Sequence, residues 1–418
     1  MSNNHFLQLS NVAIRGLTLA SKFLLIFFLA RFLEPAELGI YGLLTATVGY
    51  SLYLLGFDFY TYSTRELLKR GREEWGGVIK AQATLTVLLY AIFLPLLSLI
   101  FVEDLLPMSV IGWFFALLIL EHLTQELGRL LVAVSDQLYA SLMLFFRSGV
   151  WAVLVTGLMF VMPEARDLNV VFGAWAVGGG IALLLGICRI KRMRLDGWRQ
   201  EVDWAWIIKG LKIAFALLVA TLAIRGLFTL DRYWFQALAG MEVLGAYVLF
   251  TGISMALISF LDAGVFAFIY PDLISSYQRS DGDGFRRSFR KLLLQTAALS
   301  GLFAMVGLLA IGHLLDWLGK PLYAEQQGLF VWILLATVLY ALGMVPHYGL
   351  YAQGRDRPII HSHIASLLIF VLATWIFAQY RPQLAVPLGL CISFFFILCW
   401  KAWSFHRLTP APYRLFQS

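Results

Sequence analysis

The sequence has little charge for its length. Only 14% of its 418 residues are Asp, Glu, Lys or Arg, whereas 60% are hydrophobic. A typical soluble domain has roughly 25% charged residues. An aqueous fold of this size cannot bury so much apolar surface, so most of that surface must face lipid or other helices. The composition excludes a cytosolic enzyme, a disordered chain and a collagen-like chain, and it indicates an integral membrane protein.

Cysteine is also rare, and nucleotide-binding and metal-binding motifs are missing. Cys188, Cys391 and Cys399 lie within or beside apolar segments, and no Cys-x-x-Cys pair occurs, so neither a disulfide framework nor a zinc site is expected. His361 and His363 lack neighbouring carboxylates, and the GxxxxGKS/T loop is absent. We therefore expect no metal and no cofactor. The N-terminal MSNNHFLQLS has no basic region or cleavage site typical of a signal peptide, so none is expected.

Long apolar runs dominate the rest of the chain. They are continuous rather than alternating with polar residues, which is typical of membrane-spanning helices of about 20 residues. Charge clusters and Pro or Gly breaks divide them into twelve expected spans: 10–30, 38–60, 78–101, 108–132, 138–162, 168–188, 211–236, 244–270, 290–312, 328–351, 359–379 and 384–404. We therefore predict an all-α polytopic membrane protein with twelve transmembrane helices.

The basic residues are distributed unevenly between alternate loops. Of the 32 Lys and Arg residues, 21 lie in 61–77, 189–212, 271–291 and 352–358 or are Lys401, Arg407 and Arg414. The opposite loops contain four, namely Arg31, Arg166, Lys320 and Arg381. Because cytoplasmic loops hold the excess of Lys and Arg in membrane proteins, both termini are predicted to be cytoplasmic.

No large hydrophilic domain separates the spans. The longest hydrophilic stretch, 189–210, is basic and contains Trp198, Trp204 and Trp206, which favours a position along the inner membrane surface. The net charge of +7 therefore indicates topology and attraction to membrane lipids rather than nucleic-acid binding. Membrane polymerases and ligases generally need a substantial outer loop with paired carboxylates. The short outer loops here hold one adjacent acidic pair, Glu103 and Asp104, so an enzyme is not expected.

A short pattern occurs twice in the same order. Residues 38–45 read LGIYGLLT and residues 244–251 read LGAYVLFT, while IRGL occurs upstream of each, at 14–17 and 224–227. Six spans per copy preserve the orientation, so the halves are parallel repeats. We predict two pseudo-symmetric six-helix lobes around a central cavity. The expected divisions are an N-terminal lobe (1–188), a basic cytoplasmic connector (189–210), a C-terminal lobe (211–404) and a cytoplasmic tail (405–418).

The first helix of each expected lobe carries cations at membrane depth. Arg15 and Lys22 lie two turns apart on one helix, and Arg225 and Arg232 on the other, with Asp231 beside them. A charge at the bilayer centre costs at least about 2.5–3.5 kcal/mol on insertion scales, so such residues mark pathways or paired sites. Snorkelling to the membrane surfaces would explain Arg15 and Arg232, but Lys22 and Arg225 are too central for it. We interpret these cations as the wall of a basic cavity.

The fourth and fifth expected helices carry further charges. Glu126 and Arg129 are spaced for an intrahelical pair, whereas Glu121 has no partner on its own helix, and Arg147 lies on the next one. Two interpretations stay open. The charges neutralise one another between the two helices, or they form a polar interior that binds a headgroup or a coupling ion.

The segment ARFLEPAELGIYGLLTATVGYSLYLLGFDFY resembles the N-terminal signature of polysaccharide transporters in the multidrug/oligosaccharidyl-lipid/polysaccharide (MOP) exporter superfamily, in particular the Wzx-type O-antigen flippases. The pattern R-x-L-x-P-x-E-x-G-x-Y falls on Arg31, Leu33, Pro35, Glu37, Gly39 and Tyr41. Length, twelve spans, cytoplasmic termini and two lobes extend the resemblance over the chain. The two extra helices usual in lipid II flippases are not found.

The resemblance implies a flippase that moves undecaprenyl-pyrophosphate-linked oligosaccharide from the cytoplasmic to the periplasmic leaflet of the bacterial inner membrane by alternating access. A pyrophosphate at membrane depth needs cations that replace its hydration, and Arg offers bidentate donors; Arg147 joins Arg15, Lys22, Arg225 and Arg232 as candidates. The resemblance also implies ion coupling, with Glu121, Glu126 and Asp231 as the candidate carboxylates. The implied partners are the lipid-linked oligosaccharide, membrane lipids, and the polysaccharide polymerase and chain-length machinery.

A small-molecule antiporter of the multidrug and toxin extrusion type is the alternative with the same fold. Such proteins export cationic drugs, so their cavity should contain excess acid. The cavity inferred here is basic, which favours an anionic cargo. An oligosaccharide polymerase or ligase is a third class, and it would elongate glycans without any other component.

Overall fold

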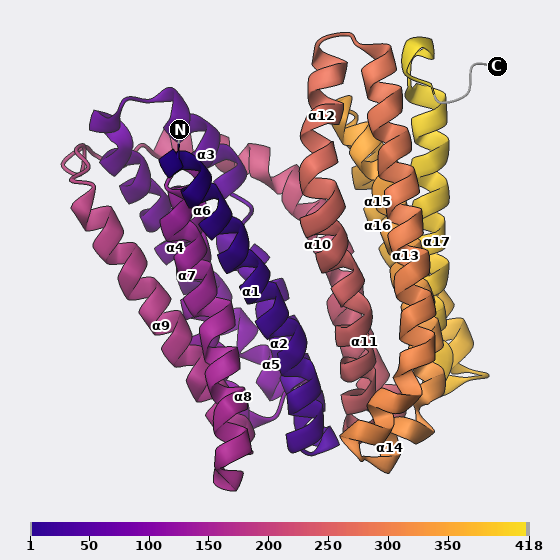
Figure 1. The fold of residues 1–418 in the computed structure, drawn as a ribbon. Helices are drawn as coiled ribbons and strands as arrows, with labels where there is room; N and C mark the ends of the chain where they lie inside the picture. The colour runs from indigo at the N-terminus through magenta and orange to yellow at the C-terminus, as the bar shows by residue number, and fades with distance from the viewer. Residues whose placement is uncertain (1, 415–418) are drawn as a thin grey trace. The chain divides into compact units, whose positions relative to one another are not determined.

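The computed structural model describes residues 2–414, and every regular element among them is helical. The α-helices are α1 (Ser2–Phe32), α2 (Pro35–Gly56), α3 (Tyr60–Lys69), α4 (Trp75–Leu97), α5 (Leu99–Val102), α6 (Ile111–Ala133), α7 (Gln137–Phe145), α8 (Trp151–Val161), α9 (Leu168–Arg192), α10 (Trp204–Ala239), α11 (Met241–Leu261), α12 (Ala267–Gln278), α13 (Gly282–Leu318), α14 (Pro321–Glu325), α15 (Gln327–Ala352), α16 (Asp356–Ala378) and α17 (Pro382–Leu408) (Figure 1). Two π-helical turns, η3 (Phe146–Val150) and η5 (Asp262–Phe266), join α7 to α8 and α11 to α12. Short 3₁₀ turns are η1 (Arg72–Glu74), η2 (Met108–Val110), η4 (Pro163–Ala165) and η6 (Ala411–Tyr413). The predicted all-α fold class is confirmed.

Eleven described helical segments are long and apolar enough to span a membrane, and α10 makes a twelfth, with a bend of 45° between Phe215 and Leu217. This number agrees with the sequence analysis, but several ends differ. Helix α13 has 37 residues, which corresponds to about 55 Å and exceeds a hydrocarbon core of roughly 30 Å. The expected loop 271–291 is therefore mostly helix, because hydropathy marks only the part of a helix that contacts lipid.

The chain divides into two compact units. Unit 1 comprises Met1–Leu33 and Ile40–Leu222, and unit 2 comprises Glu34–Gly39 and Ala223–Ser418. The basic stretch 189–210 and the start of α10 lie in unit 1. Trp206 and Ile207 are buried there against Phe59 and Tyr62, so aromatic packing ties this stretch to α3.

In unit 1, α6 packs against α7 and α9, while α1 packs against α7, η3 and α8 (Figure 1). Helix α9 approaches the π-helical turn closely at Gly178. A Cβ atom at this position would lie 2.7 Å from the carbonyl oxygen of Phe146, so a larger residue would push the two backbones apart. This close packing positions η3 and the arginine that it carries.

In unit 2, α17 packs against α15 and α16, and α13 packs against α12 and α15 (Figure 1). Aromatic rings fill the core between these helices, as where Phe289 stacks on Phe405 with ring centroids 4.4 Å apart. The opposite face of α13 is apolar and exposed, and Leu309 reaches 72% exposure. In a membrane protein such a face contacts lipid.

The two LGxY copies contact each other reciprocally. A Cβ atom on Gly39 would lie 2.5 Å from the carbonyl oxygen of Met241, and one on Gly245 would overlap the carbonyl oxygen of Pro35. Pro35 and Met241 are 206 positions apart in the sequence, and so are Gly39 and Gly245. The same backbone contact is therefore made twice about a local two-fold axis. Glycine is required at both positions because any side chain would enter the neighbouring backbone.

Candidate functional site

Unit 1 contains a cavity of about 390 Å³. Side chains of α1, α3, α6, α7 and η3 line it, and its polar residues are Arg15, Tyr60, Thr64, Thr124, Gln125, Arg129 and Arg147. Val132, Met143 and Leu144 are among its apolar residues. Three guanidinium groups thus reach one cavity, and none of the described lining residues is acidic.

Arg147 lies on the π-helical turn η3. Such turns add one residue to a helix and are frequent at functional sites, since they displace a side chain from its helical position. The Nε atom of Arg147 lies 3.3 Å from Oε2 of Glu121 on α6. Trp175 of α9 donates to the other oxygen of Glu121 at 2.7 Å. Glu121, which lacks a partner on its own helix, is therefore paired between helices.

Arg129 is fixed by contacts on both sides of its guanidinium. Its Nη1 atom lies 2.6 Å from Oε1 of Glu126, and the amide of Gln82 donates to Oε2 of Glu126 at 2.6 Å. The guanidinium also lies 3.6 Å from the ring centroid of Tyr60, which is a cation–π contact. Burial raises the pKa of the Tyr60 phenol and Arg129 opposes this shift, so the hydroxyl stays protonated and can donate.

Arg15 differs from the other two arginines of the cavity. Its Nε atom donates to the hydroxyl of Ser141 at 3.2 Å, and it forms no ion pair among the described residues. Lys22, two turns further along α1, lies within electrostatic range of Glu121 and Arg147. Glu126 and Glu121, which do not line the cavity, neutralise Arg129 and Arg147. Arg15 therefore leaves the cavity with a net positive charge.

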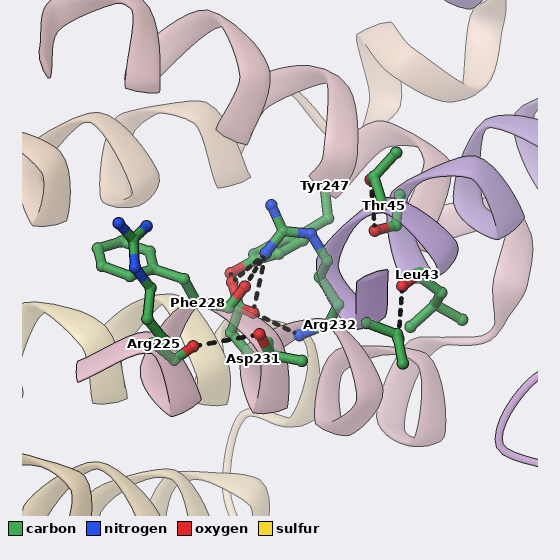
Figure 2. Close-up of polar contacts among 10 residues, drawn as sticks. Leu43, Thr45, Arg225, Phe228, Asp231, Arg232 and Tyr247 are labelled. Atoms are coloured by element: carbon green, nitrogen blue, oxygen red, sulfur yellow. Dashed lines mark hydrogen bonds and ion pairs between the residues drawn. The ribbon is translucent and has the colours of Figure 1, made fainter. Parts of the chain in front are cut away.

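The cations expected on the first helix of the second repeat lie in unit 2, where Arg232 belongs to a closed cluster (Figure 2). Asp231 is 1% exposed and accepts hydrogen bonds from Tyr247 Oη at 2.7 Å and from the backbone N–H of Arg232 at 2.8 Å. Nη1 of Arg232 lies 3.1 Å from Asp231 and donates to the carbonyl of Phe228. Figure 2 shows the guanidinium of Arg225 pointing away from this cluster. Arg225 instead lies within electrostatic range of Asp262.

The structure therefore brings Arg15 and Arg147 into one cavity, with Lys22 near them. The three candidate coupling carboxylates, Glu121, Glu126 and Asp231, are each held by an arginine. Arg129 and Tyr60 were missed as cavity residues. The Glu126–Arg129 spacing indicated the ion pair, but nothing in the sequence indicated that this pair borders the cavity.

A second cavity in unit 1, of about 450 Å³, lies where α9 ends. Its charged lining residues are Arg72, Asp136, Arg189 and Arg192. Asp136 pairs with Arg189 at 2.5 Å, so the cavity keeps an excess of basic groups. Such a wall suits anionic headgroups or phosphates. No group of three or more His, Cys, Asp or Glu that could hold a metal ion occurs among the described residues.

Comparisons with known proteins agree on family and fold. The family model described as polysaccharide biosynthesis protein matches residues 6–278. Among solved structures, an inward-facing multidrug resistance MATE family transporter of the MOP superfamily matches with a TM-score of 0.74 at 12% identity, covering 96% of this chain and 98% of that one. An outward-facing structure of such a transporter matches with a TM-score of 0.64 at 14% identity, covering 96% and 95%. No curated protein gives a significant match.

Proposed function

Because this chain belongs to the polysaccharide biosynthesis protein family and has the fold of MOP-superfamily transporters, we propose that it is a flippase for lipid-linked oligosaccharides. Its cargo is an undecaprenyl-pyrophosphate-linked repeat unit of the O-antigen type. The protein moves this cargo from the cytoplasmic to the periplasmic leaflet of the bacterial inner membrane. The arginine-lined cavity of unit 1 is the observation that carries the proposal.

The chemistry of a pyrophosphate fits this cavity. Its two phosphates must exchange water for other donors at membrane depth, and guanidinium groups provide paired N–H donors that match phosphate oxygens. Arg15 has no carboxylate competitor among the described residues, so it is the residue most available to the cargo. Thr64 and Gln125 offer further donors from the same wall. A volume of about 390 Å³ suits the diphosphate end of the cargo rather than the whole glycan.

The second cavity supports the same direction of transport. Arg72, Arg189 and Arg192 belong to segments that the distribution of Lys and Arg predicts to be cytoplasmic. A basic cavity at this level attracts the diphosphate headgroup from the inner leaflet before it reaches Arg15. A multidrug antiporter is the competing function, because the similar solved structures are described as multidrug transporters. The three arginines of the first cavity, Arg15, Arg129 and Arg147, would repel the cationic drugs that such antiporters export.

A deletion strain tests the proposal directly. Lipid-linked repeat units should accumulate and stay on the cytoplasmic leaflet, where an added membrane-impermeant glycan-modifying enzyme cannot reach them in spheroplasts. A strain that lacks the polysaccharide polymerase is the matched control, since its repeat units reach the outer leaflet and are modified. Normal surface polysaccharide together with hypersensitivity to cationic drugs would instead establish the antiporter.

A further inference from the structure

Three nitrogen bases meet inside unit 2, apart from the cavities of unit 1 and from the Asp231–Arg232 cluster. The Nζ atom of Lys401 on α17 lies 3.1 Å from Nδ1 of His347 on α15 and 3.0 Å from Nε2 of His363 on α16. The two imidazole rings are nearly parallel, with centroids 6.1 Å apart. Lys401 is only 1% exposed. It lies on α17, seven residues before this helix ends at Leu408.

Lys401 has no carboxylate partner among the described residues, which is unusual for a buried cation. Tyr348 and Tyr351 on α15 lie against the ring of His347, and Tyr270 on α12 lies against both tyrosines. Other titratable groups on the helices around the site include Tyr340 on α15, Asp356, Arg357 and His361 on α16, Cys399, His406 and Arg407 on α17, Asp262 on η5, and Arg290 and Lys291 on α13. Asp262 lies within electrostatic range of Tyr348, and Asp356 within range of Tyr270. These two carboxylates therefore border the aromatic layer beside the three bases rather than Lys401 itself.

The geometry suits two protonation states. An ammonium at Lys401 donates to both imidazole nitrogens, and a neutral amine still has two N–H groups that can donate to the same two nitrogens. Gaining or losing one proton therefore changes the charge without breaking either hydrogen bond. Burial without a counter-ion opposes the charge, whereas the two imidazole acceptors favour it. These opposing effects act on the same nitrogen.

We propose that His347, Lys401 and His363 form a proton-binding site that couples the transport cycle to a proton gradient. The coupling part rests on the proposed function, whereas the binding of a proton does not. One proton moves between water and Lys401 Nζ or an imidazole nitrogen, so only an N–H bond forms or breaks. Tyr351 extends the site toward the end of α15 at Ala352, since it is 45% exposed and its ring is parallel to that of His347 at 6.4 Å.

This site replaces the carboxylates predicted from the sequence as the coupling group. Glu121, Glu126 and Asp231 each sit against an arginine, so protonating any of them would break an ion pair and leave the arginine charge unbalanced. Protonating one of the three bases of unit 2 breaks no ion pair that the structure shows between them and a carboxylate. They can exchange a proton while their heavy atoms stay in place.

Nitrogen NMR tests the proton site without any substrate. The chain contains nine Lys and seven His, so ¹⁵N-labelled Lys and His in lipid bilayers give few enough signals to follow. The Lys401 signal is identified by its absence in Lys401→Met, and the His347 and His363 signals by their absence in variants of those residues. We expect either the Lys401 signal to change between ammonium and amine or a histidine signal to change between imidazolium and imidazole, somewhere between about pH 5.5 and 9. If all three side chains keep one protonation state across this interval, the proton site is wrong.

Coupling is tested in proteoliposomes that contain a pH-sensitive dye and undecaprenyl-pyrophosphate-linked repeat units. Lys401→Met removes the amine that joins the two imidazoles and Lys401→Arg keeps a permanent charge, so both should reduce substrate-driven proton flux at least tenfold. His361→Asn is the matched control, because His361 is exposed on α16 two residues from His363, and its flux should equal that of the wild type. If either Lys401 variant is unfolded in a thermal melt, His347→Gln replaces it in the assay, and its proton flux should be reduced as well.

The outcomes separate the two proposals. Wild-type flux in Lys401→Met, with oligosaccharide still translocated, would overturn the coupling role and leave the flippase in place. If the wild-type protein translocates no oligosaccharide, the proposed function fails, and the NMR titration alone then decides the proton site.

Discussion

At the scale of single residues, the sequence predicted charges on the apolar helices but not which of them are neutralised. Arg15 and Arg232 look alike in the sequence, because each lies on the first helix of a repeat. In the structure Arg15 donates to a neutral serine, whereas Arg232 closes on Asp231. Partners on other helices depend on helix rotation and packing, which hydropathy and spacing do not encode. Lys401 shows the same limit, since one lysine near the end of an apolar run is indistinguishable from a surface anchor.

The different partners predict different effects of removing the two charges. Arg15→Gln should lower flippase activity roughly tenfold or more, because a charge-assisted hydrogen bond is worth about 1.5–3 kcal/mol. Its thermal stability should stay near that of the wild type, since the substitution removes one hydrogen bond to the neutral Ser141 and breaks no ion pair of the described residues. Surface polysaccharide in a complemented deletion strain and thermal unfolding in detergent measure the two effects. Wild-type polysaccharide levels in Arg15→Gln would show that this arginine does not contact the cargo.

Arg232→Gln should instead act on stability. The substitution leaves Asp231, which is 1% exposed, without its counter-ion. Breaking a buried pair in this way costs about 3–5 kcal/mol. Purified Arg232→Gln should therefore unfold at a lower temperature and accumulate less in the membrane, and the double variant Arg232→Gln with Asp231→Asn should recover part of the loss. An unchanged melting temperature in Arg232→Gln would contradict a structural role.

At the scale of elements, the repeat in the sequence predicted related helices, and the structure shows what the repeated residues do. Gly39 and Gly245 occupy the same position in the two copies of the repeat, and each lies directly against a backbone carbonyl of the other copy. This reciprocity could not be predicted, because it depends on which helices cross. The π-helical turns could not be predicted from the sequence either, since an extra residue in a helix leaves the hydropathy pattern unchanged. Their effect is local but important, because η3 carries Arg147.

The glycine contact predicts that alanine is not tolerated at either position. Gly39→Ala and Gly245→Ala each place a methyl group against a backbone carbonyl oxygen, so each should destabilise the protein by about 1–3 kcal/mol. Gly49→Ala on α2 is the matched control, because a Cβ atom there meets nothing within 4 Å. It should be neutral or stabilise the helix by about 0.5–1 kcal/mol. Thermal unfolding of the three variants tests this prediction, and equal melting temperatures would show that the backbone contacts at Gly39 and Gly245 are not tight.

At the scale of the whole molecule, composition and apolar runs were sufficient to predict an all-α membrane protein with about twelve spans, which the structure bears out. Hydropathy could not locate the division into units, because α10 is apolar on both sides of its bend although its first part packs on α3. Orientation across the membrane rests on the distribution of Lys and Arg and stays a prediction. It determines which cavity faces the cytoplasm, so it bears on the direction of transport.

Cysteine labelling at the two ends of α9 tests this orientation. Glu164 lies just before the helix and Arg192 ends it, and 25 helical residues span about 37 Å, enough to separate the two across a bilayer. In a variant whose Cys188, Cys391 and Cys399 are replaced, a membrane-impermeant maleimide should label Glu164→Cys in spheroplasts. Arg192→Cys should react only after permeabilisation, because its basic segment is expected on the cytoplasmic side. The reverse pattern would invert the topology and place the second basic cavity on the periplasmic side, where it could not attract a headgroup from the inner leaflet.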